Sequence, residues 1–72
     1  KLTLKEFELL SLLLENRNKL LNRDTILNRI WGYDYVGETR TVDVHITNLR
    51  KKMGKYADNI ETVRGVGYRF KE

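Results

Sequence analysis

The residues best suited to chemistry lie on one side of a helix predicted over Arg40–Met53. At 3.6 residues per turn, an apolar stripe forms from Val42, Ile46, Leu49 and Met53. The opposite face carries two cations, three hydrogen-bonding side chains, one valine and no acid: Arg40, Thr41, Val44, Thr47, Asn48 and Lys51. A face without acids suits a polyanion with readable edges, which is duplex nucleic acid. For an isolated helix, a merely solvent-exposed face is the simpler interpretation, so the rest of the chain has to decide.

The chain offers little for catalysis or metal binding. His45 is the only histidine, cysteine is absent, and Ser11 lies among leucines with no base that the sequence places beside it. Glu38 and Asp43 are near each other along the chain, but acid pairs without a pocket are more often solvated or ion-paired. We therefore expect no enzyme activity, no catalytic residue, no metal ligand, no cofactor and no small-molecule ligand.

Length and charge restrict the classes of partner. Seventy-two residues make one small domain, near the lower limit at which a single core is self-sufficient. The formal net charge is +4, and residues 37–72 carry eight bases and five acids, against six and five in residues 1–36. This basic second half favours an anionic partner. No apolar run is long enough to span a bilayer and no signal peptide is recognisable, so we expect no membrane association and a cytoplasmic location.

Two capped helices are predicted ahead of Arg40–Met53. Thr3 and Glu6 have capping-box spacing, which predicts a helix from there to about residue 15. Its expected core face is rich in leucine and consists of Phe7, Leu10, Leu13 and Leu14, broadened by Leu9 and Leu12. Residues 19–21 predict a brief extended segment, and Asn22 is the expected cap of a second helix that ends at Gly32. The expected buried side of this second helix consists of Ile26, Leu27, Ile30 and Trp31.

The loop between the second and third helices has two interpretations. Residues 32–38 (GYDYVGE) place two tyrosines in a segment punctuated by glycine. These tyrosines either contact another protein or cover the core, and the sequence favours neither. Thr39 is the expected N-cap of the third helix, and Gly54 is its expected terminator.

A hairpin is predicted after Gly54 and a polar connector at residues 55–59. Residues 60–64 and 68–71 are rich in β-branched and aromatic side chains, with a glycine-based turn between them. This turn lacks the third glycine and the following helix of a nucleotide-binding loop. The hairpin is expected to present Arg64 and Tyr68 at its tip, beside Thr62. A cation on such a thin ribbon can enter a narrow groove where a helix cannot.

Together these elements predict a mainly α fold with a small β-hairpin, which is a winged helix-turn-helix of three helices plus a C-terminal wing. In this arrangement the second helix braces the third, the third enters the major groove, and the wing reaches the neighbouring minor groove or the backbone. Specific binding of double-stranded DNA is the favoured function. Two alternatives stay open: a protein-interaction winged helix anchored by Trp31, Tyr33 and Tyr35, and an RNA-binding winged helix.

The same stretches resemble a known family. LTLKEFELLSLLL, RDTILNRIWGYDYVGETRTVDVHITNLRKKM and IETVRGVGYRF are similar to the C-terminal effector domain of OmpR/PhoB-type bacterial response regulators, and the resemblance covers essentially all 72 residues. It implies that residues 1–72 form a single winged-helix domain from a longer regulator of a two-component phosphorelay system. In such a regulator a phosphorylatable receiver domain controls transcription regulation. The resemblance also implies a homodimer on direct-repeat half-sites.

The resemblance assigns roles by position. The base-edge readers it implies are Thr41, Val44, Thr47 and Asn48, and the implied backbone contacts are Trp31, Arg40, His45 and Arg50. The implied wing contacts are Thr62, Arg64 and Tyr68, and the implied RNA polymerase contact loop contains Tyr33, Asp34, Tyr35, Val36 and Glu38. Lys51, on the acid-free face, is expected to hold the helix to the DNA backbone. For Arg50, which lies nearer the flank, an ion pair with an acid such as Asp43 is the alternative.

Two features depart from the family pattern. Family members usually begin with a small N-terminal antiparallel sheet, and its absence here predicts that part of the first helix's apolar face is exposed. Relatives often carry arginine where Thr47 and Asn48 stand, so the family's DNA sequence preference does not transfer. From the residues themselves, Asn48 can bond adenine at two positions and Val44 can meet a thymine methyl, which predicts A·T-rich half-sites.

Overall fold

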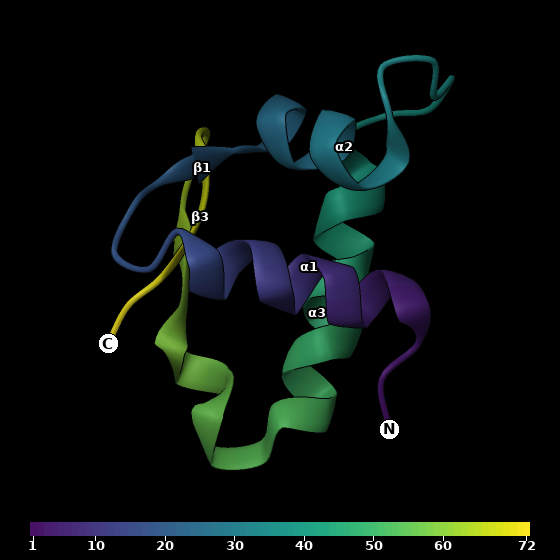
Figure 1. Cartoon of the computed structure of the whole chain (residues 1–72). Coiled ribbons are helices and arrows are strands. Elements are labelled where there is room, and N and C mark those ends of the chain that lie inside the picture. The colour runs from purple at the N-terminus through teal and green to yellow at the C-terminus, as the bar shows by residue number, and fades with distance from the viewer.

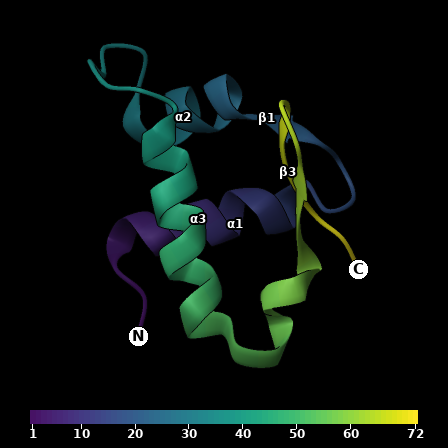
Figure 2. The same cartoon turned by 180° about the vertical axis from the view of Figure 1, so that it is seen from behind.

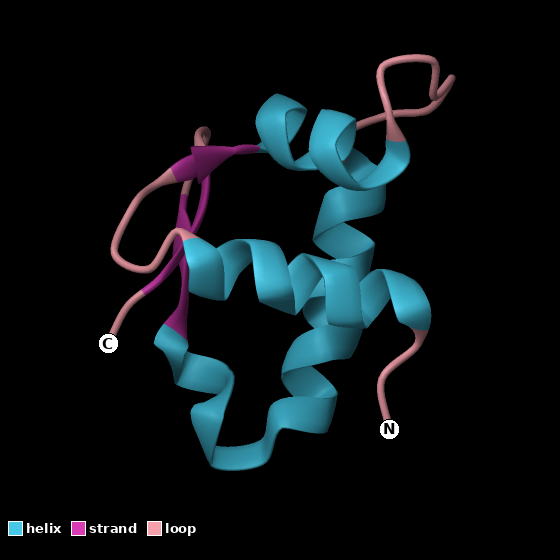
Figure 3. Ribbon diagram, viewed as in Figure 1, coloured by secondary structure: helices cyan, strands magenta, loops and turns pink.

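A computed structural model describes residues 1–72 and contains three α-helices, one 3-10 helix and three short strands. In chain order these are α1 (Leu4–Glu15), β1 (Leu21–Asn22), α2 (Arg23–Trp31), α3 (Arg40–Met53), the 3-10 helix η1 (Gly54–Asn59), β2 (Ile60–Val63) and β3 (Gly67–Phe70). Helix α1 crosses α3, α2 packs near the N-terminal end of α3, and the strands stand beside the helices (Figure 1). Coloured by secondary structure, the strands form one small patch on a mainly helical molecule (Figure 3). The predicted three helices and hairpin are thus confirmed.

Helix α1 begins at the expected capping box, but it buries a different face from the one predicted. The Thr3 hydroxyl accepts from the Glu6 N–H at 3.2 Å, and Glu6 Oε1 accepts from the Thr3 N–H at 2.9 Å. The residues buried on α1 are Glu6, Leu9, Leu12 and Leu13. Phe7, assigned to the core from the sequence, is 58% exposed. Leucines surround most of α1, so their spacing singles out no face, and buried Glu6 marks the side that packs on α3.

Helix α2 has the caps that its sequence predicts, whereas the start of α3 differs from expectation. Asn22 Oδ1 accepts from the Thr25 N–H at 2.8 Å, and Gly32 ends α2 with φ of +94°. Thr39 occupies the N-cap position as predicted, but it has helical backbone angles and its side chain makes no capping hydrogen bond. Backbone turns precede α3 instead, because the Thr41 N–H donates to the Glu38 carbonyl at 3.0 Å. Such turns satisfy the first free N–H groups without a side-chain cap.

The end of α3 follows the prediction, and the segment after it is more regular than expected. Gly54 has φ of +60°, a backbone conformation that glycine adopts without the penalty a Cβ brings. The predicted polar connector, residues 55–59, forms most of η1, and β2 begins at the residue after η1 ends. The short 3-10 helix therefore carries the chain from the C-terminal end of α3 to the wing.

The predicted hairpin is confirmed, and a third strand joins it, a pairing that the sequence did not predict. The antiparallel sheet has the order β1-β3-β2, with Leu21 opposite Tyr68 and Asn22 opposite Gly67. A Cβ on Gly67 would lie 1.9 Å from the Leu21 carbonyl oxygen, so glycine is required for this approach. The extended segment expected at residues 19–21 is strand only from Leu21. The wing is thereby tied to the residue that caps α2.

The core lies where the three helices meet the sheet. It consists of Leu9, Leu12, Leu13, Ile26, Leu27, Val42, Ile46, Leu49, Ile60 and Tyr68. Of the side chains that the sequence assigned to α2's buried face, Ile26 and Leu27 are buried, while Ile30 and Trp31 are half-buried. None of the helices is both long and apolar enough to cross a membrane.

Candidate nucleic-acid interface

The apolar stripe and the acid-free face of α3 lie as the 3.6-residue period predicts. Val42, Ile46 and Leu49 are completely buried. The residues exposed on the opposite face are Arg40, Val44, Thr47, Asn48 and Lys51, and Thr41 is partly exposed. Figure 2 shows α3 from the side that faces away from α1. Because this side is open along the helix, the face is free to contact a large partner.

Internal hydrogen bonds occupy some of the polar groups on this face and leave others available. The Thr47 hydroxyl donates to the Asp43 carbonyl at 3.0 Å, so its methyl group is the more available part. The Thr41 hydroxyl lies 3.2 Å from the Tyr35 hydroxyl. The side-chain amide of Asn48 makes no hydrogen bond within the protein, and the Val44 side chain is 50% exposed. Asn48 and Val44 are thus the side chains most available for direct contact with base edges.

Asp43, the one acid of α3, is held against the wing and α2. Its Oδ1 accepts from Arg23 Nε at 2.8 Å and from the Tyr68 hydroxyl at 2.5 Å. Burial alone would raise the pKa of the Asp43 carboxyl, but the hydrogen bonds from Tyr68 and Arg23, with the Arg23 charge, outweigh it and lower that pKa. The negative charge beside the acid-free face is therefore paired within the protein and does not oppose an anionic ligand.

Arg50 has different partners from the alternative that the sequence suggested. Its Nη2 donates to the Ile60 carbonyl at 2.5 Å and to the Thr62 hydroxyl at 2.8 Å, both on β2. It does not pair with Asp43, whose cationic partner is Arg23. No local sequence pattern distinguishes the two arginines as partners of Asp43, because Arg23 is 20 positions from Asp43. Arg50 thus fastens α3 to the wing, with its guanidinium beside the exposed Thr62.

Tyr68 is not at the tip of the wing, which corrects its expected role as a surface contact. It lies in β3, the middle strand, and is only 5% exposed. Alternate residues of a strand point to opposite sides, and Tyr68 points toward the helices, where its hydroxyl meets Asp43. Burial, and then the hydrogen bond to Asp43, raises the pKa of the Tyr68 hydroxyl. Arg64, by contrast, is exposed in the turn and forms no ion pair.

Trp31, Tyr35 and His45 form an aromatic cluster at the N-terminal end of α3. The centroid of the Trp31 ring lies 4.8 Å from that of the His45 ring, in an edge-to-face arrangement, and 6.1 Å from that of the Tyr35 ring. His45 Nδ1 lies 2.8 Å from the Thr41 carbonyl oxygen. A carbonyl oxygen only accepts, so Nδ1 must carry the proton, and Nε2 remains for an outside partner. His45 therefore packs against the tryptophan and keeps one nitrogen free.

The two tyrosines of the loop before α3 differ, so each fits one of the two interpretations that the sequence left open. Tyr35 is 38% exposed and contacts the aromatic cluster, whereas Tyr33 is 83% and Val36 is 99% exposed. A Cβ on Gly37 would lie 2.1 Å from the Tyr35 ring, so the ring closes over the backbone there. One tyrosine of the loop thus belongs to the aromatic cluster, and the tip presents an apolar side chain and a second tyrosine to solvent.

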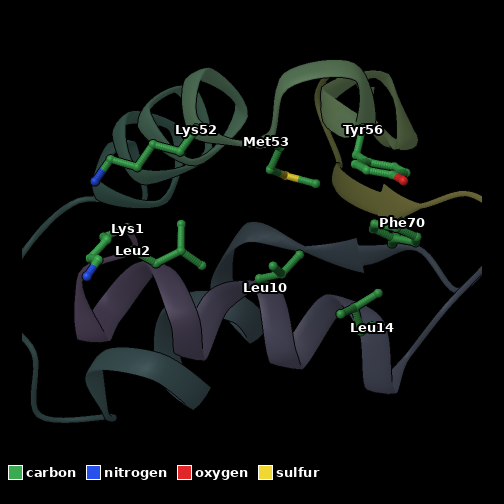
Figure 4. A pocket seen from close by; sticks show the side chains of 8 residues that line it. All are labelled: Lys1, Leu2, Leu10, Leu14, Lys52, Met53, Tyr56 and Phe70. Atoms are coloured by element: carbon green, nitrogen blue, oxygen red, sulfur yellow. The ribbon is translucent and has the colours of Figure 1, made fainter.

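A second open surface lies on the opposite side of the molecule. A hollow of about 410 Å³ separates α1 from the C-terminal end of α3 and is lined by Leu10, Leu14, Met53 and Phe70, among others (Figure 4). Leu4 is 70% exposed on α1. These exposures agree with the expectation that part of the apolar face of α1 is uncovered. The hollow is separate from the acid-free face, since α1 packs against the other side of α3.

Comparison with known proteins identifies relatives over almost the whole chain. Residues 1–70 match the family described as transcriptional regulatory protein, C terminal. The regulatory protein VanRB of Enterococcus faecalis is 52% identical over 71 residues, which are 99% of this chain and 31% of that protein. The chain thus spans about a third of the length of this curated relative.

Two solved structures have the same fold. DrrB of Thermotoga maritima, described as an OmpR/PhoB homolog, has a TM-score of 0.87 and 35% identity, covering 100% of this chain and 34% of that one. The RstA DNA-binding domain of Klebsiella pneumoniae, solved in complex with the RstA box, has a TM-score of 0.85 and 36% identity, covering 99% of this chain and 73% of that one.

Proposed function

Because the chain belongs to the family of transcriptional regulatory protein C-terminal domains, the DNA-binding output domain of OmpR/PhoB-type response regulators, we propose that it reads specific duplex DNA with α3 in the major groove. One observation carries this proposal: α3 presents an acid-free, open face, and the one acid of the helix, Asp43, is paired with Arg23 and Tyr68. The RstA DNA-binding domain, which was solved in complex with the RstA box, supports DNA as the class of ligand.

In this mode of binding, some residues of the interface contact base edges and others contact the DNA backbone. Direct contact with base edges is assigned to Thr41, Val44, Thr47 and Asn48, and backbone contact to Trp31, Arg40, His45, Arg50 and Lys51. The wing contributes Thr62 and Arg64 to the minor groove or backbone. Asn48 can bond the N6 and N7 atoms of adenine, and Val44 can meet a thymine methyl, which favours A·T pairs in the half-site.

A binding-site selection from random duplexes tests this reading. We expect enrichment of an A·T-containing half-site, and Asn48→Ala should relax the preference at one base pair at a loss of about 1–3 kcal/mol. Lys1→Ala, which removes an exposed cation on the α1 side, is the matched control and should leave the selected sequence unchanged. Selection that enriches no sequence would remove the proposed readout.

Two other ligand classes are separated by competition. A helix that fits the major groove of B-form DNA cannot enter the narrow major groove of A-form RNA, so duplex DNA should compete far better than RNA. A protein-interaction domain would instead show no chemical-shift change along residues 40–51 when duplex DNA is added. RNA that competes as well as duplex DNA, or an absence of chemical-shift change along residues 40–51, would replace the DNA-binding proposal.

The arrangement on DNA is proposed from the family. We expect two copies on direct-repeat half-sites, forming a homodimer on DNA, with a receiver domain in the full-length protein and activity in the bacterial cytoplasm. The chain spans only a third of VanRB, which supports a further domain in the full-length protein. The spacing of half-sites from the selection reports the arrangement, since direct repeats and inverted repeats give different spacings and orientations.

A second contact is proposed for the loop formed by Tyr33, Asp34, Tyr35, Val36 and Glu38. Its exposed tip, with Tyr33 and Val36, is free to meet RNA polymerase while α3 holds DNA. Tyr33→Ser should reduce activated transcription without changing DNA affinity, whereas Tyr56→Ser, at an exposed tyrosine of η1, should change neither. Equal transcription from the Tyr33→Ser variant would exclude this contact.

A further inference from the structure

The wing is attached to α3 by a cluster of polar side chains whose function the readout does not explain. Tyr68 of β3 donates its hydroxyl proton to Asp43 Oδ1 at 2.5 Å, and Arg23 Nε donates to the same oxygen at 2.8 Å. The guanidinium groups of Arg23 and Arg50 each lie 5.8 Å from the centroid of the Tyr68 ring. One tyrosine therefore contacts the start of α2, the first half of α3 and, through Arg50, the second half of α3.

The cluster meets α3 next to its reading residues. Asp43 immediately precedes Val44 in sequence, and its carbonyl accepts the Thr47 hydroxyl at 3.0 Å. On the wing side, Tyr68 lies opposite Thr62 in the sheet, and Arg64 directly follows Val63, the last residue of β2. The bond between Tyr68 and Asp43 thus joins the helix that carries the groove face to the strand pair that carries Arg64.

Polar bonds fix a geometry more narrowly than apolar packing does. A hydrogen bond between a hydroxyl and a carboxylate is short, directional and strengthened by the charge. Apolar contacts, in contrast, are non-directional and tolerate small displacements. Asp43 lies on α3 and Tyr68 on the middle strand, so the bond between them, together with the bonds from Arg50 to β2, connects the wing to α3 in a defined orientation.

We propose that the Tyr68 hydroxyl is a positioning group that holds the wing at a fixed distance from α3, so that Arg64 and the acid-free face engage one duplex together. This inference rests on the proposed DNA binding. Tyr68 touches no DNA in this role and acts through Asp43 and Arg64. Its removal should leave Arg64 present but no longer aligned with the groove next to α3.

A double-mutant cycle tests the proposal. In the wild-type background, Arg64→Ala should weaken binding to the selected duplex about tenfold. In the Tyr68→Phe background, which keeps the buried ring and removes only the hydroxyl, Arg64→Ala should weaken binding less than about threefold. Tyr56→Phe removes the hydroxyl of an exposed tyrosine that bonds nothing, and in that background Arg64→Ala should again cause the full loss.

The outcomes are distinguishable. The same factor for Arg64→Ala in the wild-type and Tyr68→Phe backgrounds would overturn the positioning role, even if Tyr68→Phe lowers stability. If Tyr68→Phe does not fold, the cycle is run with Asp43→Asn, which weakens the same bond. Absence of duplex binding by the wild-type protein would overturn the proposed function instead. Residual dipolar couplings of the wing amides in the free domain then decide the inference, which fails if Tyr68→Phe leaves the wing orientation unchanged.

Discussion

The salt dependence of DNA binding should reveal how many cations of the interface meet phosphate. Three cations of the proposed interface, Arg40, Lys51 and Arg64, form neither an ion pair nor a side-chain hydrogen bond within the protein, whereas Arg50 is bonded to β2. Each phosphate contact contributes about −0.9 to the slope of log affinity against log salt, so three predict a slope of about −2.7. Between about 50 and 200 mM salt, this slope corresponds to a loss of affinity of about 40-fold.

Removing one of these cations should change the slope by a known amount. Lys51→Ala should reduce the slope by about 0.9, so its penalty at about 50 mM salt should exceed that at 200 mM by roughly 3.5-fold. Arg50 is bonded to Ile60 and Thr62, and if it also contacts phosphate the wild-type slope should approach about −3.6. Fluorescence anisotropy with a labelled duplex carrying the selected site measures all of these values.

Two controls separate charge from readout. Asn48→Ala removes a neutral side chain, so it should lower affinity without changing the slope. Lys1→Ala removes a cation on the α1 side and should change neither. If Lys51→Ala has the same slope as the wild type, Lys51 meets no phosphate, and the orientation of α3 proposed above is wrong.

Three further predictions concern the scaffold. Leu49→Ala, at a completely buried position of α3, should lower the free energy of unfolding by about 2–5 kcal/mol, measured by denaturant titration, and a loss below 1 kcal/mol would mean that the site collapses around the cavity. The hydrogen bond from Lys52, and then that from the Thr3 backbone, lower the pKa of the Glu6 carboxyl. The stability that the Glu6 carboxylate contributes is therefore present above its ordinary pKa near 4.5 and is lost as the pH falls below that value. The melting temperature of Glu6→Gln should fall less on acidification than that of the wild type, and parallel curves of melting temperature against pH would contradict this. Gly67→Ala should lower stability by about 1–3 kcal/mol and expose the β1 amides to hydrogen exchange, because the added Cβ meets the Leu21 carbonyl, and unchanged protection would contradict the clash.

The sequence predicted the interface face well because that face depends on one periodicity. The spacing of Val42, Ile46 and Leu49 defines the buried side of α3, and the acid-free residues opposite follow from the geometry of a helix. The caps at Thr3 and Asn22 were predictable for the same reason, since each bond joins residues only three positions apart. Local spacing fixes local bonds.

The features that the sequence did not predict depend on contacts between distant residues. Asp43 and Tyr68 are 25 positions apart, and nothing near either residue indicates that they bond. The buried face of α1 was misassigned because its leucines allow several rotations, and only packing against α3 selects one. Thr39 illustrates a third limit, because a backbone turn replaced the side-chain cap that its residue type favours.

The availability of Asn48 and Val44 has a consequence for how this domain can change. Neither side chain holds the fold together: Val44 is 50% exposed, and the Asn48 amide bonds nothing within the protein. Substitutions at such surface positions usually alter stability by less than about 0.5 kcal/mol. The wing and the helices are held by other residues, such as Asp43 and Tyr68. Target preference and folding stability are therefore encoded separately, so a lineage can acquire a new operator by replacing a few side chains while the scaffold stays intact.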